Sequence, residues 1–174
     1  MTYCVGLKIN KGLVFMSDTR TNSGIDNIST FQKMHTWSKE GDRVITLLNA
    51  GNLATTQLVI SLLDERSKAP NDRSPSIFEA QSMFQVAQLV GETLREVIET
   101  ASPQGELADS NFTATLILGG QISTGKPSLF LIYPEGNFIE ASTDTPFFQS
   151  GETKYGRPIL IRAYKPDLSF EEAV

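Results

Sequence analysis

The chain has 174 residues, 40% of them hydrophobic, and this size and composition predict a single domain with a buried core. Its 15 Lys and Arg residues against 20 Asp and Glu residues give a net charge of −5 without a basic block, which argues against nucleic-acid binding. A single cysteine (Cys4) and a single histidine (His35) argue against an internal disulfide and a typical zinc site, and we expect a cytoplasmic protein with no signal peptide and no membrane partner.

The first residues predict a β-hairpin. Residues 3–9 alternate in the pattern of a strand with one buried face, residues 10–12 form a turn with a glycine, and residues 13–16 are apolar. Such a hairpin returns Asp18 to the end at which the chain begins, so we expect Asp18 to lie next to Thr2.

Thr2, Asp18 and Lys33 form a candidate catalytic set. Removal of Met1 by a methionine aminopeptidase would leave Thr2 with a free α-amine, whose reference pKa near 8 suits a base for its own hydroxyl. A lysine ammonium would lower the pKa of that hydroxyl, and a carboxylate would hold the lysine. Retention of Met1 would remove this base. Spacing alone does not decide whether these three residues are catalytic, because Met-Thr is a common start and Asp-Thr-Arg also occurs by chance.

Several short elements are expected before and through the first helix. We predict a polar loop at 21–29, a strand at 31–37 carrying Lys33, a turn at 40–43, a buried strand at 44–50 and a helix at 52–67. Gly51 lies at the change from strand to helix. Its missing side chain would let a substrate backbone approach, and its N–H could donate to an oxyanion, although a glycine that simply starts a helix fits equally well.

The second half of the chain continues with a helix pair, hairpins and further helices. We predict a loop at 68–75, a short helix opened by the Ser76–Glu79 capping box, and then a helix with an apolar stripe from Met83 to Ile98. After a loop at 101–110 we predict a strand at 112–118 that ends at Gly119-Gly120, and paired strands at 128–133 and 138–141. The last predicted elements are a helix at 155–164 and a helix capped by Ser169 and Glu172. This order predicts an α+β fold in which two sheets pack together with helices outside.

Several motifs resemble those of the proteasome β-subunit family and occur in the same order. They are Thr-x-x-x-Gly at the start, Ser17-Asp18-Thr19-Arg20, Lys33 and Ala50-Gly51-Asn52. The start Met-Thr-Tyr-Cys-Val-Gly and residues 31–35, Phe-Gln-Lys-Met-His, are most similar to bacterial Anbu (ancestral β subunit), a relative of HslV. The resemblance covers the whole chain. One departure is that the Thr2–Lys33 spacing is one residue shorter than in typical proteasome subunits, which a deletion in the preceding loop would absorb.

The resemblance implies a four-layer αββα sandwich of the N-terminal-nucleophile hydrolase type. It implies that Thr2 is the nucleophile, that Lys33 tunes it, that Asp18 orients Lys33, and that the Gly51 N–H holds the oxyanion. Residues 149–151 resemble the family's Gly-Ser-Gly with Gln149 in place of the first glycine, so Ser150 would lie beside the nucleophile. The same resemblance assigns Arg20 a supporting role and Thr21 and Asn49 contacts with substrate. No metal and no organic cofactor are implied.

The resemblance also implies more chain than is present here. The sequence stops at Val174, one turn into a helix that in the family continues into two strands carrying an aspartate and a serine of the active site. We therefore expect residues 1–174 to be one proteasome-like domain truncated at its C-terminus.

Three functions remain open from the sequence. The first is a threonine-type peptidase acting on peptide or protein substrates within a homo-oligomeric ring or helical assembly, with an ATPase unfoldase as a potential partner. The second is a non-catalytic scaffold subunit, favoured by the truncation and by a retained Met1. The third is a small-molecule amidase, because such enzymes share the fold and the chemistry. Exposure of Thr2 separates peptidase from scaffold, and an enclosed chamber separates peptidase from amidase.

Overall fold

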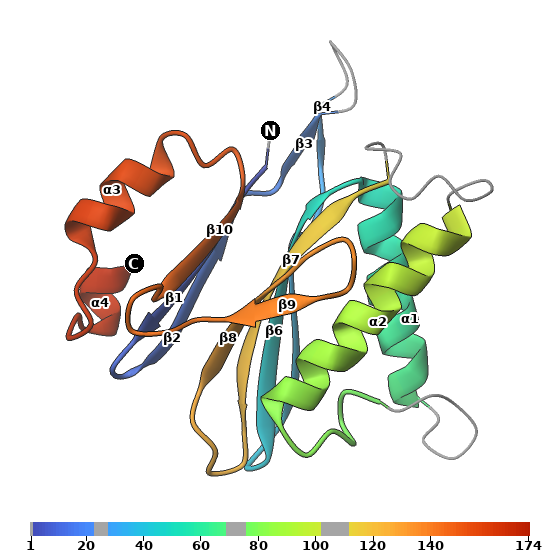
Figure 1. The fold of residues 1–174 in the computed structure, drawn as a ribbon, viewed down its shortest axis with the longest axis horizontal. Coiled ribbons are helices and arrows are strands. Elements are labelled where there is room, and N and C mark those ends of the chain that lie inside the picture. The colour runs from blue at the N-terminus through green and yellow to red at the C-terminus, as the bar shows by residue number, and fades with distance from the viewer. Residues whose placement is uncertain (1, 23–27, 69–75, 102–111) are drawn as a thin grey trace.

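The computed structural model describes residues 2–22, 28–68, 76–101 and 112–174 (Figure 1), without the side chains of residues 21, 22, 28 and 29. In chain order the elements are β1 (Tyr3–Ile9), β2 (Gly12–Ser17), β3 (Arg20–Asn22), β4 (Ile28–Thr30), β5 (Met34–Lys39), β6 (Arg43–Gly51), α1 (Leu53–Lys68), α2 (Met83–Ala101), β7 (Ala114–Ile122), β8 (Ser128–Ile132), β9 (Phe138–Glu140), β10 (Phe147–Gly151), α3 (Gly156–Ala163) and α4 (Phe170–Ala173).

Two antiparallel sheets form the centre of the molecule. One has the strand order β10-β1-β2 and the other β5-β6-β7-β8-β9, while β3 and β4 form a separate ribbon. Figure 1 shows α1 and α2 against the outer face of the five-stranded sheet, and α3 and α4 outside the three-stranded sheet. The four layers are therefore helix, sheet, sheet and helix, which confirms the predicted α+β sandwich.

Both faces of the five-stranded sheet carry buried apolar side chains. The larger core lies between the five-stranded sheet and the two long helices, and the apolar stripe of α2 supplies much of it, including Met83, Val90 and Leu94. A smaller core between the two sheets contains Cys4, Leu48 and Ile117. The helical periodicity predicted for residues 83–98 thus marks a buried face, as expected.

Two predicted boundaries near the N-terminal third were wrong. The polar segment predicted as a loop at 21–29 is flanked by the paired strands β3 and β4, and residues 23–27 lie outside the described part. The strand predicted at 31–37 begins at Met34, so Lys33 precedes it, although the Lys33 carbonyl accepts a hydrogen bond from Asn49 N at 2.9 Å. Polar composition concealed the ribbon, because its residues show neither an apolar run nor the alternation of apolar and polar side chains that indicates a strand.

Two further boundaries differ in the second half. Strand β7 does not stop at Gly119-Gly120 but continues to Ile122; Phe15 of the facing sheet lies 2.7 Å from where a Gly119 Cβ would be, so close sheet packing explains this glycine. The Ser76–Glu79 box forms, with Glu79 Oε2 accepting from Ser76 N at 3.1 Å, but residues 77–79 make a turn rather than a helix.

The remaining elements match the predictions closely except β10, which was not predicted as a strand. The capping box of α4 is complete: Ser169 Oγ accepts from Glu172 N at 3.2 Å, and Glu172 Oε2 accepts from Ser169 N at 2.9 Å. The predicted loops at 68–75 and 101–110 fall almost wholly outside the described residues. No helix in the described ranges has both the length and the apolar character needed to cross a membrane.

Candidate active site

The side chain of Lys33 is the centre of the candidate site. It is 4% exposed, and its Nζ donates to Thr2 Oγ1 at 2.9 Å, to Asp18 Oδ1 at 2.8 Å and to the carbonyl oxygen of Arg20. Removing an ammonium from water is costly unless its protons find acceptors, and here all three do. The predicted set of Thr2, Asp18 and Lys33 is therefore assembled, with the lysine between the hydroxyl and the carboxylate.

Asp18 is fixed from several sides. Its Oδ1 also accepts from Tyr3 N at 2.9 Å, and its Oδ2 accepts from Arg20 N at 3.1 Å. Burial acts to raise the pKa of the Asp18 carboxyl, but the hydrogen bonds from Lys33 and from these two backbone N–H groups outweigh burial, so the pKa lies below its ordinary value. The carboxylate is therefore ionised at neutral pH and holds the lysine ammonium.

Backbone pairing positions Thr2 from the far end of the chain. Its carbonyl oxygen accepts from Glu152 N at 2.7 Å, and the adjacent Tyr3 pairs with Gly151 in the β1–β10 ladder. Gly151 has φ +89°, and a Cβ at this position would collide with the Thr2 carbonyl oxygen. Only glycine fits both the conformation and the close approach, so the last glycine of the Gln-Ser-Gly sequence helps to position Thr2.

Ser150 lies on the buried face of the same ladder. It is 8% exposed and stands opposite Cys4, and directly opposed residues point to the same face of a sheet. Burial raises the pKa of the Cys4 thiol to about 12, while Lys33 and Asp18 exert smaller opposing effects on it. Cys4 is therefore an inert part of the core, and the electrostatic influence of Lys33 and Asp18 on it places the Cys4–Ser150 pair near them.

The end of β6 provides the next part of the site. Asn49, 6% exposed, donates its backbone N–H to Lys33 O and accepts from Cys4 Sγ at 3.4 Å. Gly51 follows two residues later as the exposed last residue of β6, with φ +124°. A Cβ there would lie 2.5 Å from Thr113 O, so the backbone of β7 approaches too closely for any side chain.

Arg20 and Thr21 are placed differently from one another. Arg20 acts through its backbone, because its N–H bonds Asp18 and its carbonyl bonds Lys33, while its side chain is exposed. Thr21 pairs with Ser29 in the β3–β4 ribbon, but its side chain lies outside what the structure describes.

A cavity of about 360 Å³ adjoins the site between β5, β6 and α1. Asn49 and Gln32, the residue before Lys33, both line it. His35 on β5, as expected a strand residue, also lines it, and burial lowers the pKa of His35, so it is neutral at pH 7. The other lining residues are Phe31, Leu53, Thr56, Gln57, Ile60 and Ser61.

Among the cavity residues, only Asn49 was predicted from the sequence to contact a substrate. The signal available for the rest was the spacing 53, 56, 57, 60 and 61, which is one face of a helix and which α1 turns toward β5. No cluster of three or more His, Cys, Asp or Glu side chains able to hold a metal ion occurs within the described ranges.

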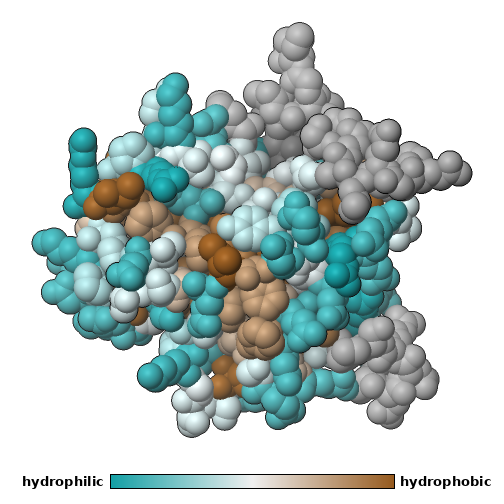
Figure 2. Space-filling model, in the orientation of Figure 1, coloured by the Kyte–Doolittle hydropathy of each residue, from teal (hydrophilic) through white to brown (hydrophobic). Residues whose placement is uncertain are grey.

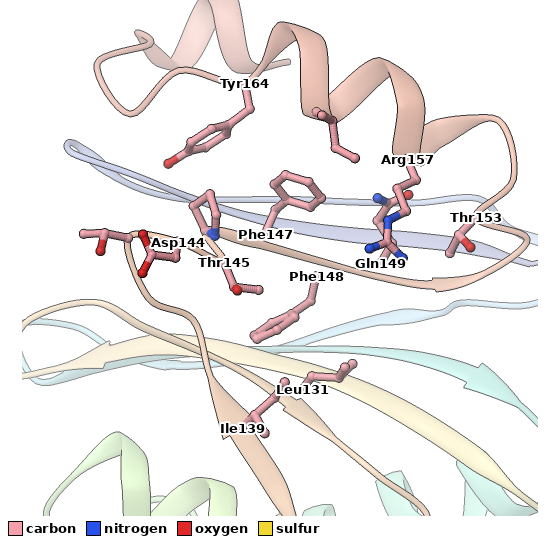
Figure 3. A pocket seen from close by; sticks show the side chains of 13 residues that line it. Leu131, Ile139, Asp144, Thr145, Phe147, Phe148, Gln149, Thr153, Arg157 and Tyr164 are labelled. Carbon is pink, nitrogen blue, oxygen red and sulfur yellow. The ribbon is translucent and has the colours of Figure 1, made fainter.

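A larger groove of about 650 Å³ lies elsewhere, between α3 and the sheets (Figure 3). Figure 3 shows Tyr164 and Arg157 above Phe147 and Gln149, with Phe148 pointing toward Leu131. None of the residues around Lys33 lines it. The larger groove is thus separate from the candidate active site.

Comparisons with known proteins point in one direction. The family model for the proteasome subunit matches residues 2–174. The structure of Anbu (ancestral beta-subunit) from Yersinia bercovieri is 46% identical with a TM-score of 0.89, covering 98% of this chain and 70% of that chain. The Anbu (Gly-1) mutant from Hyphomicrobium sp. strain MC1 is also 46% identical, with a TM-score of 0.90 and coverage of 99% and 70%.

A third structure, described as the helical assembly of the Anbu complex from Pseudomonas aeruginosa, is 44% identical with a TM-score of 0.89, covering 98% of this chain and 69% of that chain. No curated protein matches the chain.

Proposed function

The chain belongs to the proteasome subunit family, and from this premise we propose that it is a threonine-type peptidase with Thr2 Oγ1 as nucleophile. The observation that supports this most directly is Lys33 Nζ, 2.9 Å from Thr2 Oγ1 and 2.8 Å from Asp18 Oδ1. An ammonium in contact with a hydroxyl favours the deprotonated form of that hydroxyl. Thr2 is also partly exposed, so a substrate carbonyl can approach it.

The α-amine of Thr2, once Met1 is removed, acts as the base. It takes the hydroxyl proton as Oγ1 attacks the scissile carbonyl, and it returns that proton to the nitrogen of the leaving amine. The C–N bond breaks and an ester to Thr2 remains. Water then attacks the ester with the same amine as base, which releases the acid and restores the hydroxyl. Lys33 stabilises negative charge on Oγ1 through its contact with the hydroxyl.

The surrounding residues have supporting roles in this proposal. Asp18 holds Lys33 in place, and the N–H of Gly51 donates to the oxyanion at the exposed end of β6. Ser150 supports the nucleophile from β10. Arg20 holds Asp18 and Lys33 through its backbone, while Thr21 and Asn49 contact the substrate. The cavity that Asn49 shares with neutral His35 suits an uncharged substrate side chain.

We further propose that the subunit works in the cytoplasm as a homo-oligomer, with an ATPase unfoldase as the source of unfolded protein substrates. The Pseudomonas aeruginosa relative is described as a helical assembly. Large apolar side chains are exposed on this chain, including Phe84, Ile159 and Ile161, and Figure 2 shows apolar patches on the surface among polar ones. Sedimentation as a monomer at micromolar concentration would contradict self-assembly.

The test combines hydrolysis with labelling of the nucleophile. Full-length protein shown by intact mass to lack Met1 is assayed on fluorogenic peptides and then treated with a β-lactone, which acylates an activated hydroxyl. We expect peptide turnover and one acyl group on the peptide that contains Thr2. Thr2→Ala should abolish both with the fold intact, and Thr2→Ser should retain measurable turnover.

The outcomes separate the alternatives. Equal turnover by the wild type and Thr2→Ala would identify a contaminating protease. Labelling of Thr2 without hydrolysis of any peptide would favour the amidase. If a processed, assembled sample shows no labelling and no turnover, the non-catalytic scaffold is the remaining function.

A further inference from the structure

A third cavity opens at the end of the sandwich opposite Thr2. It has a volume of about 810 Å³ and lies beside the β1–β2 turn, the β7–β8 turn and the segments at Ser142–Pro146 and Tyr164–Pro166. Strand β1 separates the two ends, and its seven residues span roughly 20 Å at about 3.3 Å per residue. The cavity is therefore remote from the candidate active site, and its size is within the range of small-molecule sites.

Polar side chains occupy the sheet–sheet interior at this end. Lys8 follows Cys4 and Gly6 on the face of β1 that packs against the other sheet, because side chains alternate along a strand. Gln121 follows Ile117 and Gly119 in the same way on β7. Where the apolar core ends, a lysine and an amide thus take its place, and both line the cavity.

Three polar side chains at this cavity are unpaired among the residues that the structure describes. In the described part of the chain, the side chains of Lys8, Lys126 and Gln121 make no hydrogen bond and no ion pair. The ordered positions of Lys8 and Gln121 on strands leave their polar ends available to a bound molecule.

The charge lining the cavity is all of one sign. Lys8, Lys11 and Lys126 contribute three ammonium groups, and no carboxylate lines the wall. Lys11 interacts electrostatically with Glu172, which is not among the residues that line the cavity. Lys8 and Lys126 remain unbalanced in a protein of net charge −5. Asp144 lines the neighbouring groove of Figure 3 instead.

The rest of the wall suits a small organic anion. Hydroxyls from Ser142, Thr143 and Tyr164 line it, although the Tyr164 hydroxyl already donates to Lys8 O at 2.6 Å. Pro127 and Pro166 add apolar surface. Ammonium groups bind carboxylate and phosphate oxygens through short charge-assisted hydrogen bonds, and two of them favour a ligand carrying more than one negative charge.

We propose that this cavity binds a small polyvalent oxyanion, a polycarboxylate or a phosphate compound, through the ammonium groups of Lys8 and Lys126 and the amide of Gln121. The site is independent of the proposed peptidase chemistry and lies at the other end of the subunit.

Calorimetric titration of the full chain at low ionic strength tests the proposal, with citrate and inorganic pyrophosphate as separate probes. We expect saturable binding of one anion per subunit, by citrate if the site is built for carboxylates and by pyrophosphate if it is built for phosphates. Lys8→Gln combined with Lys126→Gln should weaken binding about tenfold or more. Gln121→Leu, which keeps every charge, should weaken it a few-fold.

Lys154→Gln is the matched control, because Lys154 is an exposed lysine outside this cavity whose ammonium lies over the Tyr155 ring. It should leave the affinity within about twofold, which excludes a general effect of net charge. Circular dichroism of each variant verifies folding. No saturable binding of either anion, or equal weakening by Lys154→Gln, would overturn the proposal.

Discussion

The two interiors of this molecule are built differently. The space between the five-stranded sheet and the helices α1 and α2 is filled mainly by apolar side chains. Its buried polar groups are paired: the Thr93 hydroxyl donates to Leu89 O at 2.8 Å and accepts from Arg66 of α1 at 2.6 Å. The space between the two sheets is apolar only in its middle. Polar and charged residues lie at its ends, with Lys33 and Ser150 at one end and Lys8 at the other. Stability should therefore reside mainly in the first interior, and chemistry at the ends of the second.

The largest expected effect is on stability in the first interior. Leu94→Ala on α2 removes a side chain that is 0% exposed, and it should lower the free energy of unfolding by about 2–5 kcal/mol. Activity per folded subunit should persist, because Leu94 touches none of the site. Leu58→Ala is the control, since Leu58 is 45% exposed on α1 and should cost about 0.5 kcal/mol or less. Urea unfolding measures the free energy of unfolding of both variants. Similar losses of stability in the two would contradict the assignment of stability to the first interior.

The next effect is on activity at the Lys33 end. Lys33→Ala should lower kcat/KM roughly 100-fold or more, because it removes the charge that stabilises the Thr2 alkoxide. Lys39→Ala, which removes a lysine that is 68% exposed, should change little. Peptide hydrolysis by protein lacking Met1 gives the comparison. A loss below tenfold for Lys33→Ala would mean that the lysine has only a structural role.

A smaller effect should depend on pH. The pKa of Asp18 is lower in the folded chain than its ordinary value, so the carboxylate contributes stability that is complete above its unfolded pKa of about 3.9 and is lost as the pH falls through the folded pKa. The difference in unfolding free energy between wild type and Asp18→Asn should therefore be present at pH 7 and shrink below about pH 4. Urea titrations at several pH values measure it, and a difference that grew in acid would contradict the assigned direction.

The smallest effect concerns Cys4, which lies in the apolar part of the second interior opposite Ser150. Burial raises the pKa of Cys4 to about 12, so the thiol should resist iodoacetamide at pH 8 in the folded protein and react once urea unfolds it. Mass spectrometry before and after unfolding gives the result. Rapid alkylation of the native chain would show that the space between the sheets opens readily.

The two interiors also differed in how well sequence predicted them. The helices that close the first interior followed from periodicity, because residues such as Val86 and Val90 repeat at helical spacing. The position of Asp18 beside the start of β1, where it accepts from Tyr3 N, followed from the hairpin. The cavity beside Lys33 did not, since it forms only when β5 and α1 meet. The continuation of β7 through Gly119 was also not predicted. Gly119 leaves room for the Phe15 side chain of the facing sheet, and the local sequence does not distinguish such a glycine from one that ends a strand.

The pairing of β1 with β10 also has a consequence for the order of events during synthesis. Tyr3 pairs with Gly151, so the strand that carries Thr2 at its start can pair with β10 only after nearly the whole of this sequence has left the ribosome. At about 5–20 residues per second, roughly 7–30 s pass between the emergence of the first strand and that of its partner. Throughout this interval the N-terminus lacks its neighbour strand and stays open to an aminopeptidase. Translation itself thus provides a period in which Met1 can be removed before the hydroxyl of Thr2 is held in place.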